Sequence, residues 1–331
     1  MFDQEDIVGM KFLGAIDVGG TKTMVGIVET YDSLPTSSKK GRILAKRLFP
    51  TYTADYHSHF ADCHTYLNEC LSDIGLSTGD LEGIGVNMPG MVDAAAGILL
   101  QAPFAGWYDV DVKDCFSRLF GTDRIFADND VNSCAKGELI FGNACNSFLW
   151  VTVSTGIGGA VIIGRQLVYG ANSCAGEIGH VKVEYENPAR CSCGQWGCAE
   201  AHASGTAITR MFSEKAGENK SLSQLLVSQN LPADAKTCSI LAQQGNDEAI
   251  AIFHTAGKYI GRALSYAANL FNPEKIYIGG GVSDSLALLM PALRTEFVRA
   301  TVRQCADIEI VKTSLDYDAA LMGAAALALT R

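Results

Sequence analysis

The segment from His180 to Cys198 has the residue types of a tetrahedral metal site. Cys191, Cys193 and Cys198 fall within a short glycine-containing stretch, and His180 lies upstream of them. Thiolate and imidazole ligands in a set of this kind predict structural zinc, because four protein ligands leave no coordination position for a substrate. The alternative is a chance grouping of free thiols in a chain with 11 cysteines.

Two carboxylates flank this predicted metal loop. Glu177 precedes His180, and Glu200 follows Cys198. A loop pinned by a metal would hold both carboxylates rigidly, and fixed acceptors of this kind suit the hydroxyl groups of a sugar. The alternative for either residue is an ordinary solvated side chain.

A second polar cluster, Asp128-Asn129-Asp130-Val131-Asn132, lies between a short apolar stretch and a predicted helix. One carboxylate of this cluster is expected to cap the helix N-terminus. Asp130 is also suited to accept the proton of a hydroxyl group that attacks phosphorus, and Asn129 offers a donor and an acceptor to a sugar. These residues alone leave the capping and the catalytic interpretations open.

Two glycine-rich turns, each between predicted strands, have the character of phosphate-binding loops. They are Gly19-Gly20-Thr21-Lys22 and Ser154–Gly159. The first is not a Walker A loop, since its lysine does not directly follow a glycine and no helix comes next. Backbone N–H groups in such turns can bind an anion, and Asp17 could hold Mg²⁺ directly or through water. An ordinary hairpin is the alternative, but the repetition favours phosphate binding.

The elements that must position these groups alternate between strands and helices, which predicts α/β layers. A third glycine run, Gly279-Gly280-Gly281, comes between a strand and a helix, where nucleotides bind in α/β folds. With 331 residues, the chain is long enough for two domains. The expected elements are strands at 11–18, 23–29, 81–88, 124–127, 148–153, 160–163 and 275–278, and helices at 54–74, 130–142, 249–270 and 319–328.

The composition argues against several classes of protein. A net charge of −10 disfavours a nucleic-acid binder, because phosphate backbones are held mainly by clustered lysine and arginine. Apolar stretches are too short for a membrane span, and Met1–Ile7 does not resemble a secretory signal. The cysteines outside the metal loop are scattered without disulfide-like pairing, which favours a reducing, cytoplasmic location.

Together these motifs resemble the ROK family, named for repressors, uncharacterised reading frames and kinases, within the actin/hexokinase/heat-shock-chaperone ATPase superfamily. The resemblance spans nearly the whole chain and implies a two-lobed actin-like (ribonuclease H-like) α/β ATPase fold with a central cleft and a zinc-bound loop. The expected lobes are 1–128 with about 316–331, and 129–315. The motifs that carry it are Ile16–Lys22, Gly176–His180, Cys191–Glu200 and the ending from Gly323.

Residue by residue, the resemblance implies that Asp130 is the general base. It assigns Cys191, Cys193, Cys198 and His180 to zinc. Sugar contacts are expected from Asn129, Glu177, His180, Glu200 and Gly90. The expected ATP and phosphate site contains Asp17, Gly19, Gly20, Thr21, Lys22, Thr155, Gly156, Gly280 and Gly281.

The implied reaction is phosphoryl transfer from MgATP to the 6-hydroxyl of a hexose. Glucose is favoured because the segments 180–200 and 203–208 look more like those of glucokinases than of hexosamine kinases. The alternatives are a kinase of an N-acetylhexosamine (GlcNAc or ManNAc) or of fructose, a donor such as polyphosphate, a sugar-sensing regulator without turnover, or a structural zinc protein.

The resemblance also bears on partners and on the ends of the chain. Structural Zn²⁺, and Mg²⁺ with ATP, are the expected cofactors, and a homodimer is expected without nucleic-acid or membrane partners. Family repressors carry a helix-turn-helix domain before the first turn, and about 15 residues there leave no room for one. The connection at 31–41 is expected to be a longer hairpin than usual.

Overall fold

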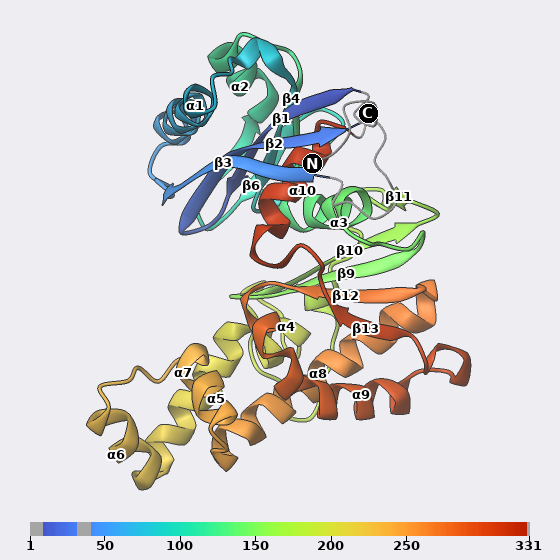
Figure 1. Cartoon of the computed structure of the whole chain (residues 1–331). Helices are drawn as coiled ribbons and strands as arrows, with labels where there is room; N and C mark the ends of the chain where they lie inside the picture. Colours follow the sequence, from blue (N-terminus) through green and yellow to red (C-terminus); the bar gives the residue numbers. More distant parts are fainter. Residues whose placement is uncertain (1–8, 32–40, 330–331) are drawn as a thin grey trace, which may run out of the picture. The chain divides into compact units, whose positions relative to one another are not determined.

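The computed structural model describes residues 9–31 and 41–329. The chain forms two compact units, each with a mixed β-sheet and packed helices (Figure 1). Unit 1 contains Met1–Cys145, Arg165–Ala175 and Thr313–Arg331, and unit 2 contains Asn146–Gly164 and Gly176–Lys312. The connection predicted at 31–41 lies, apart from its two end residues, outside the described ranges.

The main sheet of unit 1 has the strand order β3-β2-β1-β4-β8, in which β1, β4 and β8 are parallel and β1, β2 and β3 are antiparallel. The register pairs Asp17 with Asn87, and Asn87 with Asp128. The carboxyl ends of the three parallel strands therefore bring the first glycine turn and the Asp128 cluster to one edge. The strands are β1 (Met10–Val18), β2 (Lys22–Tyr31), β3 (Gly41–Pro50), β4 (Leu81–Met88) and β8 (Ile125–Asn129).

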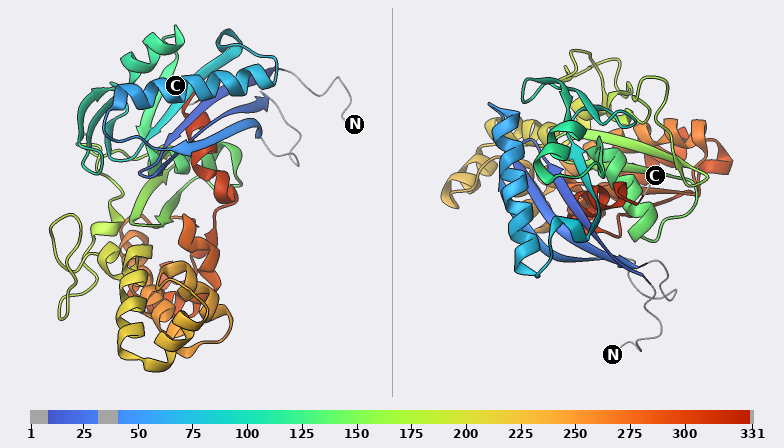
Figure 2. Two further views of the ribbon diagram at one scale, coloured as in Figure 1. Left: turned by 90° about the vertical axis from the view of Figure 1, so that its left-hand side faces the viewer. Right: turned by 90° about the horizontal axis from the view of Figure 1, so that it is seen from above.

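Alternation of side chains gives this sheet two apolar faces. One face carries Ile16 and Val25 and packs with Phe60 of α1, while the other carries Leu13 and packs with Leu321 of α10. Figure 2 shows α1 running along its face of the sheet. The helices of unit 1 are α1 (Tyr56–Asp73), α2 (Val112–Phe120), α3 (Asp130–Phe141) and α10 (Ala319–Leu327), with 3₁₀ turns η1 (Thr78–Asp80) and η5 (Asp316–Asp318).

A small antiparallel sheet, β5-β6-β7, and a short strand complete the regular structure described in unit 1. The small sheet follows β4 in the chain and contributes Leu99 and Val110 to the core under α1 and α2. These strands are β5 (Met91–Asp93), β6 (Ile98–Ala102), β7 (Trp107–Asp111) and β11 (Gln166–Leu167).

Helix α3 packs closely on α10, and both helices therefore belong to unit 1. A β-carbon at Gly137 would lie 2.8 Å from the backbone nitrogen of Gly323, so the two helices meet through glycines. Glu138 of α3 is buried and accepts a hydrogen bond from the hydroxyl of Ser314. The predicted lobe boundaries after 128 and near 316 differ from this division because α3 stays with the unit that contains α10.

Unit 2 has a sheet with the order β10-β9-β12-β13, in which β9 pairs antiparallel with β10 and parallel with β12. The register pairs Thr152 at the end of β9 with Gly279 at the end of β12. The segments that follow these two strands, the second glycine turn and Gly280, therefore start from neighbouring strand ends. The strands are β9 (Phe148–Val153), β10 (Ile157–Ile163), β12 (Lys275–Gly279) and β13 (Glu309–Lys312).

Helices make up much of the rest of unit 2. The predicted helix at 249–270 is confirmed as α8, which ends at Asn272 in a left-handed conformation. The helices between 199 and 243 were not among the expected elements. The helices are α4 (Ala199–Ala203), α5 (Gly205–Glu218), α6 (Lys220–Ser228), α7 (Ala235–Gln243), α8 (Asp247–Phe271) and α9 (Leu286–Ala300), with η2 (Ile178–His180), η3 (Gly281–Ser285) and η4 (Arg303–Cys305).

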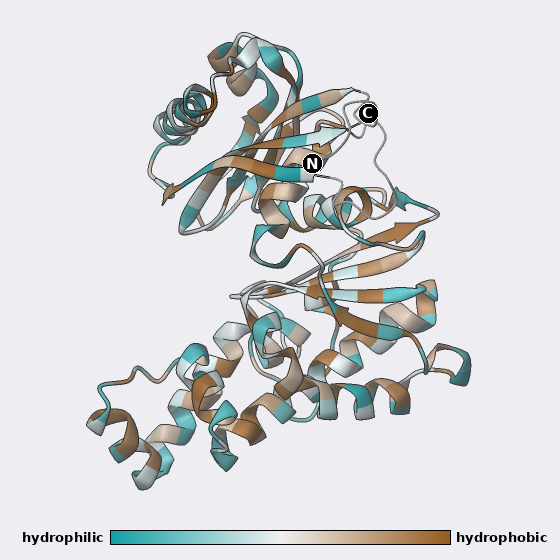
Figure 3. Cartoon of the chain, viewed as in Figure 1, coloured by the Kyte–Doolittle hydropathy of each residue, from teal (hydrophilic) through white to brown (hydrophobic). Residues whose placement is uncertain are grey.

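Hydropathy follows burial along both units. Figure 3 shows hydrophobic residues along the strands and many hydrophilic residues on α1. Within the ranges that the structure describes, helices that combine the length and the apolar character needed to cross a bilayer are absent.

Candidate active site

Asp130 is the first residue of α3, directly after β8. The helix cap is Asn129, whose Oδ1 accepts hydrogen bonds from the N–H groups of Val131 and Asn132. The Oδ1 of Asp130 accepts from the Asn129 Nδ2 at 2.9 Å and from the Val131 N–H at 3.0 Å. The cap is thus the amide of Asn129 and not a carboxylate as the sequence predicted, and the Asp130 carboxylate is held in a defined position beside it.

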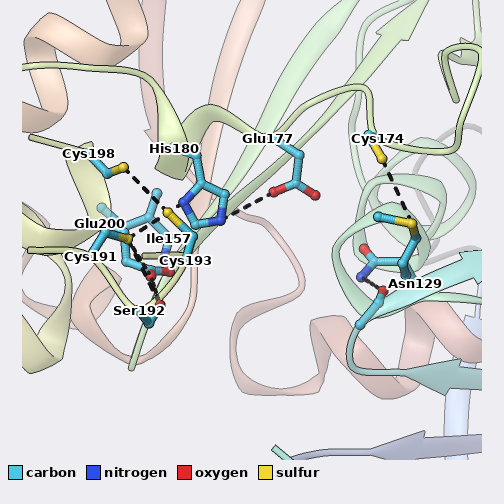
Figure 4. A network of polar contacts seen from close by, with 12 residues as sticks. Asn129, Ile157, Cys174, Glu177, His180, Cys191, Ser192, Cys193, Cys198 and Glu200 are labelled. Atoms are coloured by element: carbon cyan, nitrogen blue, oxygen red, sulfur yellow. Dashed lines mark hydrogen bonds and ion pairs between the residues drawn. The ribbon is translucent and has the colours of Figure 1, made fainter. Parts of the chain in front are cut away.

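Asn129 also reaches the loop that contains the predicted sugar contact Gly90. Its Nδ2 donates to the Gly90 carbonyl oxygen at 2.9 Å (Figure 4). Gly90 has a φ of 132°, and a β-carbon there would lie 2.2 Å from the Gln101 carbonyl oxygen. Only glycine suits this backbone, which brings the loop after β4 against the end of β8.

Asp17, at the end of β1, is electrostatically coupled to Asp130. Burial first, and the negative charge of Asp130 second, raise the pKa of Asp17 to about 7. The Asn87 Nδ2 donates to Asp17 Oδ1 at 3.3 Å and opposes the rise. The Oδ1 of Asn87 is buried without a hydrogen-bond partner among the described residues. Carboxylate oxygens are ligands that Mg²⁺ prefers, so the pair of Asp17 and Asp130 suits this ion, and the cation would favour ionised Asp17.

A buried hydrogen-bond network holds the side chain of Asp128, two residues before Asp130. The carboxylate of Asp128 accepts from the Asn129 N–H at 2.7 Å, from Asn132 Nδ2 at 3.1 Å, from Lys136 Nζ at 3.0 Å and from the Tyr169 hydroxyl at 2.7 Å. Its side chain is 1 % exposed, so the paired lysine compensates a charge that would otherwise be costly to bury. Burial, then Asp128, raise the pKa of the Tyr169 hydroxyl. Nothing in the sequence pattern indicated Lys136 or Tyr169.

The first glycine turn joins β1 to β2. The Gly19 N–H donates to the Lys22 carbonyl oxygen at 3.0 Å, which closes the turn. The carbonyl oxygens of Gly19 and Thr21 accept from the Thr51 hydroxyl at 2.7 Å and the Thr51 N–H at 2.9 Å. Two carbonyls of the turn are therefore held by Thr51. The exposed side chains of Thr21 and Lys22 flank the turn.

The second glycine turn joins β9 to β10 and is tied back in the same way. The Ser154 carbonyl oxygen accepts from the Gly205 N–H at 2.7 Å, and the Thr155 carbonyl oxygen accepts from the Thr206 hydroxyl at 2.8 Å. These donors lie at the start of α5. In both turns, two carbonyl oxygens are therefore held by a segment that lies far along the chain.

Gly280 follows β12, next to the end of β9. It has a φ of 83°, and a β-carbon there would lie 2.5 Å from the Val153 carbonyl oxygen. Gly281, the next residue, has open space around it and starts η3. Unit 2 thus brings the predicted nucleotide residues Thr155, Gly156, Gly280 and Gly281 to adjacent strand ends.

The predicted metal ligands lie together. One ligand atom from each of His180, Cys191, Cys193 and Cys198 falls within 4.8 Å of all the others. The Sγ atoms of Cys193 and Cys198 are 3.7 Å apart, as are the Cys191 Sγ and the His180 Nδ1. Tetrahedral zinc with bonds of about 2.3 Å has ligand–ligand edges of about 3.8 Å, so the donor set fits this ion. Figure 4 shows the imidazole directed at the cysteines through one nitrogen and toward Glu177 through the other.

The two flanking carboxylates differ in how they are held. Glu200 Oε2 accepts from the Ile157 N–H at 3.1 Å, and its Oε1 accepts from the Ser192 hydroxyl at 2.8 Å. This residue therefore links the metal loop to the second glycine turn. Glu177 is exposed, and its Oε2 lies 3.7 Å from the His180 Nε2.

Within each unit, the structure brings the predicted residues into one neighbourhood. Unit 1 gathers Asp17, the first turn, Gly90, Asn129 and Asp130 at the ends of parallel strands. Unit 2 gathers the second turn, Glu200 and the metal cluster, and Glu177 beside His180. Glycine turns, carboxylates and hydrogen-bonding side chains are the types of group that enzymes use for phosphoryl transfer to an alcohol.

The chain is similar to known sugar kinases and regulators over most of its length. It is 32 % identical to a glucokinase of Halalkalibacterium halodurans, with 93 % of this chain and 92 % of that protein covered. It is 29 % identical to the xylose repressor of Bacillus subtilis, covering 75 % of this chain and 61 % of the repressor. It also resembles a ROK family glucokinase from Streptomyces griseus, solved with glucose and AMPPNP, with a TM-score of 0.79, 28 % identity and coverage of 98 % and 100 %.

A family model also matches the sequence directly. The ROK family model matches residues 13–331, from the first predicted strand to the last residue. This match includes the glycine turns, the Asp130 cluster and the four predicted metal ligands. The chain belongs to the ROK family.

Proposed function

We propose that this sugar kinase of the ROK family transfers the γ-phosphoryl group of ATP to the 6-hydroxyl of a hexose, with glucose as the first candidate. The observation that carries the proposal is the position of Asp130, which accepts a hydrogen bond from Asn129 and is coupled to Asp17 at the strand ends beside the first glycine turn. The glucokinases among the relatives, and the related structure with glucose and AMPPNP, support glucose.

Asp130 has the role of general base in this reaction. The 6-hydroxyl oxygen forms a bond to the γ-phosphorus while the bond from that phosphorus to the β–γ bridging oxygen breaks and ADP leaves. The hydroxyl proton moves to the Asp130 carboxylate, whose Oδ1 is held by Asn129 and Val131. The two turns, with Gly280 and Gly281, bind ATP, and Asn129, Gly90, Glu177, His180 and Glu200 bind the sugar.

The donor sets support two different metal roles. His180 and the three cysteines would hold a structural Zn²⁺, which would cross-link the loop that leads into α4, the helix of Glu200. The ammonium of Lys182 lies 2.9 Å from the Cys198 Sγ, where it offsets the negative charge of three thiolates. Asp17 would hold Mg²⁺, which supplies charge neutralisation to the phosphates when it is bound.

Steady-state kinetics with a sugar panel test the proposal. Purified protein with MgATP is assayed by coupled ADP release against glucose, mannose, fructose, N-acetylglucosamine and N-acetylmannosamine, with Asp130→Asn as the control. Highest kcat/KM for glucose is the expected result. A preference for fructose or for an N-acetylhexosamine would correct the substrate, and turnover with polyphosphate alone would correct the donor.

The second candidate is a sugar-sensing regulator without turnover, which the similarity to a xylose repressor keeps in view. Calorimetric sugar binding by a protein with no ADP release on any sugar would favour this candidate and refute the kinase. The two-lobed actin-like fold, the homodimer and the cytoplasmic location remain predictions from the resemblance. Size-exclusion chromatography with light scattering tests the dimer.

A further inference from the structure

A buried histidine that belongs to none of the predicted sites lies behind the first glycine turn. His59, in the first turn of α1, has no exposed surface and packs near Phe49 and Trp107, with ring centroids 5.8 and 6.0 Å away. Its Nε2 lies 2.8 Å from the hydroxyl of Thr23, which is also fully buried. The Thr23 hydroxyl lies 2.9 Å from the hydroxyl of Thr51.

The hydrogen bonds from His59 through Thr23 and Thr51 to Gly19 form a path. The donor and the acceptor of each bond can be assigned from the two ends of this path. The Tyr52 N–H donates to His59 Nδ1 at 3.3 Å, so a neutral ring carries its proton on Nε2 and donates to Thr23. At the other end, Thr51 donates its hydroxyl proton to the Gly19 carbonyl oxygen at 2.7 Å. Thr51 must then accept from Thr23, so each hydroxyl proton has one assigned acceptor; the Cys63 Sγ lies farther from Nε2, at 3.9 Å. Burial lowers the pKa of His59, which agrees with the neutral ring.

The path ends at the first glycine turn, where the orientation of the carbonyl groups would affect the binding of an anion. Thr51 holds the turn twice, through its hydroxyl to the Gly19 carbonyl and through its N–H to the Thr21 carbonyl. A carbonyl released from such a hold could rotate toward a bound phosphate and repel it, because both carry negative charge on oxygen. With its proton on the Gly19 carbonyl, the Thr51 hydroxyl can only accept from Thr23, and Thr23 has its proton available for this bond because it accepts from His59 Nε2.

We propose that His59 is a positioning residue for the first glycine turn: through Thr23 and Thr51 it keeps the Gly19 carbonyl turned away from the triphosphate of ATP. This inference rests on the phosphate-binding role that the proposed function gives to the turn. His59 does not touch the nucleotide in this account. Its effect is on nucleotide affinity, not on sugar affinity.

Calorimetric binding of magnesium AMP-PNP by the full chain tests the inference. His59→Leu removes the donor, Thr51→Val removes the last hydroxyl of the path, and His59→Gln places an amide donor near the position of Nε2. Cys70→Ala is the matched control, because Cys70 is a fully buried residue of the same helix that lies outside the path. Kd for glucose and the melting temperature are measured for every variant.

A weakening of nucleotide binding by about tenfold is expected for His59→Leu and for Thr51→Val, which corresponds to the loss of one hydrogen-bond contribution. Glucose affinity should stay within about twofold, and His59→Gln should recover most of the nucleotide affinity. Because both residues act on one carbonyl, the double variant should be little weaker than either single variant. KM for ATP should rise in the same order while KM for glucose does not.

An unchanged nucleotide Kd in His59→Leu, with a melting temperature lowered as in Cys70→Ala, would show that His59 only stabilises the fold. Absent nucleotide binding by the unmodified protein would also overturn the inference. Weakened nucleotide binding in His59→Leu, in a protein that phosphorylates no sugar, would support the inference and refute the proposed function. Sugar phosphorylation with full nucleotide affinity in His59→Leu would do the opposite.

Discussion

Replacing Asp130 by asparagine should abolish most of the catalysis while leaving the fold and sugar binding intact. The carbonyl oxygen of asparagine can still accept from Asn129 Nδ2 and from the Val131 N–H, so the side chain keeps its place. What disappears is the proton acceptor. General bases contribute about 10²–10⁴ in rate, so kcat should fall by that factor, which is about 3–5 kcal/mol of transition-state stabilisation.

Two opposing effects set the stability of the Asp130→Asn variant. The N-terminus of α3 loses a favourable negative charge, worth about 0.3–1 kcal/mol. In compensation, Asp17 loses the repulsion from Asp130 that raises its pKa. The melting temperature should therefore change by less than about 4 °C.

The assays for this variant are coupled ADP release for kcat, calorimetry for glucose binding and a thermal melt. Asn129→Asp is a useful companion, because it keeps a capping oxygen but loses the amide that donates to Gly90 and Asp130. Turnover within about tenfold of the unmodified enzyme would remove Asp130 from the role of base. Loss of glucose binding together with a large drop in melting temperature would show instead that Asp130 has a structural role.

Metal analysis should return about one zinc per chain. Chelation or Cys193→Ser should lower stability and sugar affinity together, whereas the control Cys174→Ser should change neither. A metal-free protein of full stability would refute the zinc site. Gly19→Ala should weaken nucleotide binding far more than Gly20→Ala. A β-carbon at Gly19 would lie 2.6 Å from the Lys22 carbonyl oxygen, whereas the nearest neighbour of a β-carbon at Gly20 is Phe104 at 3.7 Å. Equal KM values for ATP in the two variants would contradict this prediction. With a pKa raised to about 7, Asp17 gains protons as the pH falls below that value, so the magnesium requirement should rise between pH 8 and pH 6 and should lose this pH dependence in Asp17→Asn.

The raised pKa of Asp17 also determines how this group changes the folding stability with pH. Asp17 is protonated more readily in the folded than in the unfolded protein, so its ionisation costs folding free energy. The contribution of this group is most favourable below its unfolded pKa near 4 and is lost as the pH rises through about 7. Magnesium binding to the ionised form would offset that loss.

The sequence by itself determined the features that depend on neighbouring residues. Apolar spacing predicted α1 and the buried strand β4, because the periods of helix and strand are written in consecutive side chains. The cysteine spacing predicted the metal ligands, because Cys191, Cys193 and Cys198 share one loop that must bring them close. The ROK family motifs extended these local signals to the whole chain.

Only the tertiary structure decided how distant elements support the site. Asp128 accepts a hydrogen bond from Tyr169, 41 residues away, and Thr23 is hydrogen-bonded to His59, 36 residues away. In neither pair do the residue types or their spacing in the sequence predict the contact. The packing of α3 on α10 likewise places the Asp130 helix in unit 1 against the predicted boundary. Sheet register and helix packing fix these contacts, and both result from burial summed over many residues, which no short stretch of sequence contains.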